Sequence, residues 1–265
     1  MSTASARLRQ RTEHTDWPRL AFIGSVFVIV LVIWQGYVSL IYDRPIPLPT
    51  PGSTIDAFIE MSQTGELWQA SFESAQVLLL GSIPGILLGI VLGLVIGGIP
   101  PLNTSLAPYI YAFYATPFPA LIPIFVLLFG LGNTGKAMIV FTLVVTTVLL
   151  QTIAGVRNVD ARFLEVARAF GSSPTRTLVE VHLPASMSFI VAGIRLAIGR
   201  ALVGVVVAEF DTALSGLGAL IFRYSGRLAL SHAFVPAVVF SITGILIYVS
   251  LKSAEKRLEK WRQLG

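Results

Sequence analysis

Six apolar runs decide which class of fold this chain can adopt. Each run is close to or above the roughly 20 residues that an α-helix needs to cross a bilayer. Only 12% of the 265 residues are charged and 54% are apolar, whereas about a quarter of the residues of a soluble domain are charged. We therefore predict an all-α integral membrane protein with six transmembrane helices. The runs cover residues 20–42, 74–99, 106–131, 137–156, 187–208 and 233–251.

Two other kinds of segment fit these runs poorly. The strands of a membrane barrel alternate apolar and polar residues over about ten positions, whereas these runs are longer and apolar on every face. A cleaved signal peptide has a short apolar core before a small-residue cleavage site, and the run 20–42 has no such site behind it. We expect residues 20–42 to be retained as the first span.

The distribution of basic residues predicts the orientation of the spans. Thirteen of the 19 lysines and arginines lie before the first span, in the polar stretch 157–185 or after the last span. Cytoplasmic segments of membrane proteins are enriched in Lys and Arg. We therefore expect a multi-pass membrane protein with both termini and residues 157–185 in the cytoplasm. The loop 98–108, placed on the same side, has no basic residue and does not support this orientation.

The composition argues against catalysis, a metal site and nucleic-acid binding. The chain has no cysteine, and its histidines, His14, His182 and His232, are far apart in sequence. No polar stretch combines a nucleophile with a base, or two carboxylates, in the way that an active site requires. The net charge of +5 arises at helix ends and not along one soluble face. We predict that the chain is not an enzyme and binds no metal, cofactor or nucleic acid.

The polar stretch 157–185 predicts two short helices joined at a glycine. Asp160 is a suitable N-cap for a first helix, which Gly171 ends. Ser173 and Pro174 begin a second helix, which we expect Pro184 to end. Charged residues in this stretch are incompatible with lipid, so we expect a structured loop in water. Residues 164, 167 and 171 form a narrow face of small side chains that a partner can approach closely.

The same stretch resembles a known family motif. Glu165-Val166-Ala167, then Gly171, then Val181-His182-Leu183-Pro184 match in spacing the EAA loop of the permeases of ABC importers. Val166 replaces an alanine and Val181 an isoleucine of that motif. Residues 48–258 resemble the nitrate, sulfonate, taurine and bicarbonate branch of the family. This wider resemblance rests on the stretches LPTPGSTIDAF, LLFGLGNTGK, GVRNVDARFLEVARAFG and GIRLAIGRALVGVVVAEF.

The resemblance implies a function, a set of partners and the residues of a coupling site. It implies a permease subunit of an ATP-driven importer in a bacterial inner membrane. It also implies a second permease copy, two cytoplasmic ATPases that bind ATP and Mg, and an external solute-binding protein. The loop would act as a coupling helix in a groove of the ATPase. The coupling residues it implies are Glu165, Val166, Ala167, Arg168, Gly171, Val181, Leu183 and Pro184.

A weaker motif, residues 130–137, is one residue short of a nucleotide-binding P-loop. Ala137 stands where that loop needs a Ser or Thr hydroxyl for magnesium, and apolar spans flank the stretch. We interpret it as the external turn between the third and fourth spans, with Lys136 reaching the lipid headgroups.

Two spans carry unusual residues. Glycines recur every fourth position along the second span, which predicts close packing against another span or a surface that moves during transport. Prolines of the third span, including Pro117 and Pro119, predict a kinked helix that lines a pathway or anchors in the interface. The glycines are Gly81, Gly85, Gly89, Gly93 and Gly97.

Charged residues of the fifth span are costly in lipid and so require a cavity or a partner. Arg200 is the candidate for a cation that faces the pathway, which would suit an anionic solute, although a structural ion pair explains it equally. Glu209 and Asp211 are expected at an external rim where a binding protein docks. Residues 215–222 are too short to span and predict a re-entrant or interfacial segment.

The chain is thus divided into an N-terminal cytoplasmic segment (1–19), a transmembrane permease domain (20–251) and a basic amphipathic tail (252–265). The tail is expected along the inner leaflet or as the frayed end of the last span. Ser53 and Asp56 predict the start of a short interfacial helix ending near Met61.

We expect transport of a small anion such as a sulfonate, taurine or nitrate. A pyrimidine or riboflavin importer, an ion-coupled secondary transporter and a membrane scaffold are the alternatives.

Overall fold

The computed structural model describes residues 17–40, 48–212 and 214–262, and these residues contain helices and no strand. The predicted N-terminal segment lies outside the described residues up to residue 16. Residues 41–47, before the interfacial helix, and the tail residues 263–265 also lie outside them. The all-α prediction is confirmed.

Four helices are long and apolar enough to cross a membrane: α4 (Glu66–Gly98), α7 (Asn133–Arg157), the continuous helical stretch 174–212 and α12 (Leu230–Arg262) over residues 230–252. A bent pair, α5 (Pro100–Ala115) with the segment 118–129, is a fifth if it counts as one span. The described apolar part of α2 (Trp17–Leu40) is shorter, covering Gly24–Leu40. The count of six spans stays a prediction.

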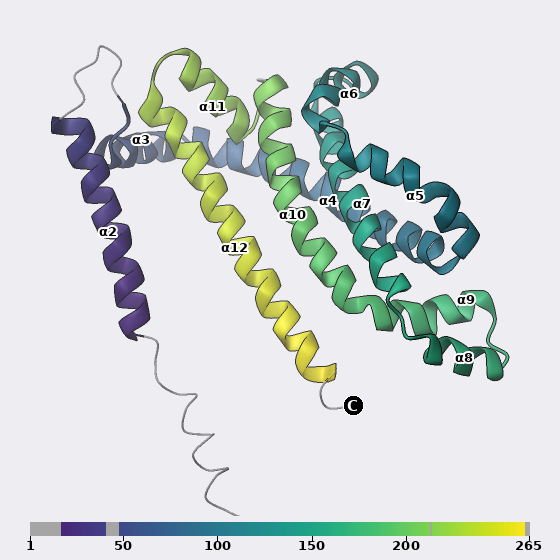
Figure 1. Cartoon of the computed structure of the whole chain (residues 1–265). Coiled ribbons are helices and arrows are strands. Elements are labelled where there is room, and N and C mark those ends of the chain that lie inside the picture. Colours follow the sequence, from purple (N-terminus) through teal and green to yellow (C-terminus); the bar gives the residue numbers. More distant parts are fainter. Residues whose placement is uncertain (1–16, 41–47, 213, 263–265) are drawn as a thin grey trace, which may run out of the picture.

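Helix α7 lies at the centre of the bundle, between α4 and α10 (Leu183–Thr212) (Figure 1). Of its most apolar window 61% is buried, against 11% for α12 at the periphery. Its buried valines, Val140, Val144 and Val148, pack with Val77 of α4 and Ala201 of α10. The core is therefore built from the middle of the chain. Helix α12 packs against α10 on one side of it, whereas α2 packs on α3.

The glycines of α4 lie directly against α7. A Cβ on Gly81 would come within 2.6 Å of the Ala137 carbonyl oxygen, and one on Gly89 within 2.8 Å of Val148 Cβ. Real Cβ atoms do not approach neighbours so closely, so these positions have room for glycine only. Because these positions have no side chains, the two backbones approach closely and gain dispersion contacts. In lipid, where no hydrophobic force joins helices, such contacts hold them together.

The third predicted span is broken where we expected one kinked helix. Helix α5 ends at Ala115, and a 3-10 turn, η2 (Phe118–Leu121), leads into α6 (Ile122–Phe129) with a bend of 90°. Thr116 precedes Pro117 and takes an extended conformation, as pre-proline residues do. Since α5 already begins at Pro100, with Ile99 the one residue between it and α4, the predicted loop 98–108 is wrong.

Helix α3 (Pro51–Gln63) is present, but its predicted cap is wrong. Thr50 is the N-cap, and its side chain and that of Ser53 form the reciprocal bonds of a capping box. Asp56 lies a turn later. The cap is set by Thr50 because Pro51 occupies the first helical position, where a missing N–H costs no hydrogen bond.

Helix α11 lies at the end of the bundle opposite α8, and α12 runs from there toward the end where α8 lies (Figure 1). Helix α11 (Leu217–Gly226) is a ten-residue helix with a buried first turn that packs on α10, α12 and α4. The segment predicted as re-entrant or interfacial is this short helix. The tail up to Arg262 continues α12 without a break, so a separate tail helix is not formed.

Candidate functional site

The stretch 157–185 folds around helix α8 (Ala161–Ala169). Asp160 caps it by accepting from the Arg162 N–H at 2.9 Å. At the other end Ser172 N–H donates to the Ala167 carbonyl and Gly171 N–H to the Arg168 carbonyl, with Gly171 at φ +68°. This pair of bonds is the Schellman motif, which needs a left-handed residue at the position of Gly171. The predicted helix and its glycine elbow are confirmed.

The second helix begins as predicted but does not end at Pro184. Ser173 caps α9 (Pro174–Thr177), and the chain continues through a π-helical turn, η3 (Leu178–His182), into α10. The Leu183 N–H donates to the Leu178 carbonyl, five residues back. The wider π turn accommodates a proline ring that would clash with a carbonyl in a regular α-helix. The loop is thereby joined to α10 without an interruption.

The exposed face of α8 is apolar. Phe163, Val166 and Phe170 are 61%, 55% and 86% exposed, and their spacing of three and four residues places them on one side of the helix. On the small-residue face that we expected to receive a partner, Ala167 is buried, Leu164 is half-buried and Gly171 is exposed. Phe163 and Phe170 were not among the predicted coupling residues, although two aromatic residues seven apart on a charged helix are a sequence signal for such a face.

A groove of about 940 Å³ runs along this face, between α8 and the chain that follows it. Four of the predicted coupling residues line it together with Phe163 and Phe170, namely Val166, Ala167, Val181 and Pro184. Glu165 and Arg168 are exposed, whereas Leu183 is half-buried at the start of α10 and lies outside the groove lining. The motif residues thus fall into three groups: those that line the groove, the exposed charged residues Glu165 and Arg168, and Gly171 at the elbow.

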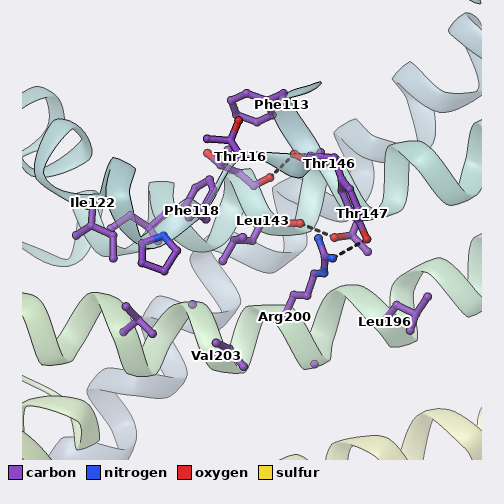
Figure 2. A pocket seen from close by; sticks show the side chains of 17 residues that line it. Phe113, Thr116, Phe118, Ile122, Leu143, Thr146, Thr147, Leu196, Arg200 and Val203 are labelled. Atoms are coloured by element: carbon purple, nitrogen blue, oxygen red, sulfur yellow. Dashed lines mark hydrogen bonds between the residues drawn. The ribbon is translucent and has the colours of Figure 1, made fainter. Parts of the chain in front are cut away.

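A second cavity of about 540 Å³ lies between the broken segment, α7 and α10 (Figure 2). Arg200 projects into it from α10, and Pro119 lines it from η2. Pro117, at the bend itself, is not among the lining residues. The apolar walls include Phe113, Phe118, Leu143, Leu196 and Val203.

The hydrogen bonds around this cavity determine what it offers to a solute. The hydroxyls of four threonines donate to backbone carbonyls four residues earlier, at 2.6 to 3.0 Å. The threonine oxygens therefore offer only lone pairs, which accept hydrogen bonds, to a solute in the cavity. Arg200 and Tyr114 are therefore the lining side chains with donor hydrogens available for a ligand. The threonines are Thr116, Thr142, Thr146 and Thr147.

Arg200 and Tyr114 also contact each other. The guanidinium donates to the Tyr114 hydroxyl at 2.5 Å, and its central carbon lies 4.2 Å from the centre of the tyrosine ring. A cation above an aromatic face is attracted by the ring quadrupole. Arg200 thus lines the cavity and also bridges two helices through a neutral tyrosine. Its role as a pathway residue stays a prediction.

At the α11 end, two charged residues are buried contrary to expectation. Lys136 is 1% exposed and Glu209 is 0% exposed. The Glu209 carboxylate accepts from Ser74 Oγ at 2.8 Å and from the Gly218 N–H at 2.9 Å. Lys136 does not reach headgroups, and Glu209 is not on an external rim, because both bind the segment that begins α11.

The family described as "Binding-protein-dependent transport system inner membrane component" matches residues 85–263. The riboflavin transport system permease protein RibX of Chloroflexus aurantiacus is 30% identical over 261 residues, 98% of this chain and 97% of that protein.

Two relatives come from Escherichia coli. The permease protein SsuC, whose name refers to transport of aliphatic sulfonates, is 33% identical over 236 residues, 88% of each chain. The taurine transport system permease protein TauC is 25% identical over 263 residues, 96% of each chain.

Proposed function

The chain belongs to the family of binding-protein-dependent transport system inner membrane components, and from this premise we propose that it conducts a small anionic solute. It is a permease subunit of an ABC importer and a multi-pass membrane protein. Its relatives are transport subunits and not enzymes. The proposal concerns the cargo, the partners and the residues that serve each.

The anionic cargo is supported by one observation above the others, the presence of Arg200 in a mostly apolar cavity. A single guanidinium supplies one positive charge and a planar donor edge that matches a sulfonate or carboxylate group. The apolar walls favour an anion that also has an apolar body, and the threonine lone pairs can accept hydrogen bonds from donor groups of such a solute, for example the ammonium of taurine. The relatives named for taurine and aliphatic sulfonates fit this chemistry, whereas RibX keeps riboflavin as the alternative cargo.

The apolar face of α8 supports a partner on the side where 157–185 lies. Exposed aromatic side chains in water are unfavourable unless a protein covers them, and contiguous ones mark interaction sites. We assign to this face a cytoplasmic ATPase that binds ATP and Mg, one for each of two permease copies. The start of α2 and the end of α12 lie at the same end of the bundle as α8 (Figure 1), in agreement with cytoplasmic termini. A solute-binding protein would deliver cargo at the α11 end.

The test is purification of the tagged chain with its partners, followed by uptake into liposomes. We expect an ATPase to co-purify, and ATP-dependent uptake of labelled taurine or methanesulfonate. Uptake of riboflavin without uptake of either anion would reject the anionic cargo. Uptake that persists without ATP but disappears with the proton gradient would instead identify an ion-coupled secondary transporter.

A further inference from the structure

Helix α5 is attached to the bundle mainly along one side. It packs on α4 and α7, whereas Tyr109 and Tyr111 on its surface are 75% and 60% exposed. Its last turn is followed by the extended Thr116 and by Pro117, which has no N–H and therefore breaks the helical hydrogen-bond series. The 90° bend at this point divides α5 from α6. The helix thus ends at a natural hinge.

One contact joins the end of α5 to α10 across the mouth of the cavity. Tyr114, in the last turn of α5, receives the 2.5 Å hydrogen bond from Arg200 and lies under its guanidinium. The two residues are 86 positions apart in sequence. Phe113 and Thr116, on either side of Tyr114, line the cavity together with Leu196, one turn before Arg200. A change in this contact therefore changes the wall of the cavity itself.

The chemistry of the contact makes it replaceable by an anion. A phenol oxygen is a neutral acceptor, and a hydrogen bond from a guanidinium to an anionic oxygen is stronger than one to a neutral oxygen. An anion in the cavity would also be paired with the full positive charge of Arg200. The nearby threonine hydroxyls do not compete for this anion, since they donate to the backbone.

We propose that the contact between Arg200 and Tyr114 is a latch that holds the end of α5 against α10. An anion in the cavity opens the latch when it accepts the hydrogen bond of the guanidinium in place of Tyr114. Release of Tyr114 lets α5 move about the hinge at Thr116 and Pro117, and the cavity widens. Tyr114 is then a positioning residue, which determines when the cavity opens. This inference rests on the proposed anionic cargo.

The experiment measures the distance between α5 and α10 in the full chain. Because the chain has no cysteine, Tyr111→Cys and Met187→Cys give two specific spin-label sites without further changes. Both residues are exposed and neither lines the cavity. The labelled chain is diluted with unlabelled chain in lipid nanodiscs, so that pulsed electron paramagnetic resonance reports the distance within one chain. Methanesulfonate, taurine and nitrate are the anionic probes, and dimethyl sulfone is the neutral counterpart of methanesulfonate.

We expect a single short distance without ligand, and a second, longer distance on addition of methanesulfonate but not of dimethyl sulfone. Tyr114→Phe keeps the ring and removes the hydroxyl, so it should shift the ratio of closed to open chains by about tenfold or more without any anion. Tyr109→Phe, which removes a hydroxyl from the exposed part of α5, is the matched control and should not change the distances. Arg200→Gln should be open and insensitive to anions.

An unchanged distance distribution in Tyr114→Phe overturns the latch. So does a wild-type chain that responds to none of the three anions, or equally to dimethyl sulfone. A complex that imports taurine with ATP while the labels show no anion response refutes the latch and keeps the proposed function. Anion-dependent opening in a chain that supports no ATP-driven uptake keeps the latch and refutes the proposed function.

Discussion

The ammonium group of Lys136 donates to both the carbonyl oxygen and the hydroxyl of Ser215, at 2.9 and 2.7 Å. The lysine extends from the first turn of α7 and the serine precedes α11, so one side chain joins two parts of the bundle. The following N–H groups are also bound: Gly216 donates to Glu73 and Leu217 to Ser74, each at 2.9 Å. With Glu209 of α10, which accepts from the Gly218 N–H at 2.9 Å, side chains from α4, α7 and α10 fix the start of α11.

Replacement of Lys136 should destabilise the protein. Lys136→Met keeps the length of the side chain but removes two hydrogen bonds from a charged donor, and leaves Glu209 buried without nearby positive charge. Each such bond is worth about 1.5–3 kcal/mol, so we expect a loss of at least about 2 kcal/mol in the free energy of unfolding. Thermal melting in detergent measures it, with Lys252→Met on α12 as the control. Equal melting temperatures for the two variants would contradict this role.

The glycine seam between α4 and α7 gives a second prediction. Gly89→Ala places a Cβ at 2.8 Å from Val148 Cβ and 3.0 Å from the Val145 carbonyl oxygen. Overpacking of this kind costs about 1–3 kcal/mol, and we expect a lower melting temperature. Gly24→Ala on α2 is the control, because a Cβ there has no atom within 4 Å. If both variants melt alike, the seam is more adaptable than the packing indicates.

The elements were predictable from sequence where a local rule decided them. Asp160, Gly171 and Ser173 carry capping signals whose geometry depends on adjacent residues alone, and each is found as predicted. Pro184 was misjudged because its effect depends on whether the preceding turn can widen, and residues 178–182 do so. At Pro117 we predicted a kink, but the helix ends there. A proline can have either effect, and the sequence around it does not decide between them.

The buried charges were not predictable in the same way. Lys136 lies near the end of an apolar run, where reaching the headgroups and pairing inside the bundle look alike in sequence. The partner, Ser215, is 79 residues away, and only the packing of α11 brings it close. For Arg200 the sequence left two roles open, and the structure shows a residue that takes part in both a cavity and a contact.

A third prediction concerns alkaline pH. Burial and then the hydrogen bond to Glu66, at 2.6 Å, raise the pKa of Tyr224 to about 12. The folded protein therefore keeps the phenol proton at pH values where the unfolded chain has lost it, from about pH 10 upward. The contribution of this proton to stability is complete below about pH 10 and is lost as the pH rises through 12.

Melting temperatures of the wild type and Tyr224→Phe, measured from pH 9 to 12, check this sign. We expect the wild type to lose more stability than Tyr224→Phe over this interval, because the phenylalanine has no proton to lose. Lysines titrate in the same range in both proteins and cancel in the difference. A larger loss in Tyr224→Phe would contradict the raised pKa.

The apolar face of α8 leads to the last prediction, on association with the ATPase. Phe163→Ala and Phe170→Ala each remove an exposed aromatic side chain that lines the groove. Phe170 is the C-cap residue of α8, but it caps the helix through its backbone N–H, which alanine keeps. Aromatic residues that fill a partner's pocket contribute about 2 kcal/mol or more to binding, which corresponds to roughly thirtyfold weaker association for each substitution.

Arg162→Ala, on the same helix but outside the groove lining, is the matched control. Co-purification of the ATPase, with expression and melting temperature recorded for each variant, separates loss of binding from loss of folding. Full association of the double variant Phe163→Ala/Phe170→Ala would show that the ATPase binds elsewhere, whereas equal losses in Arg162→Ala would indicate that charge on α8, and not its apolar face, carries the contact.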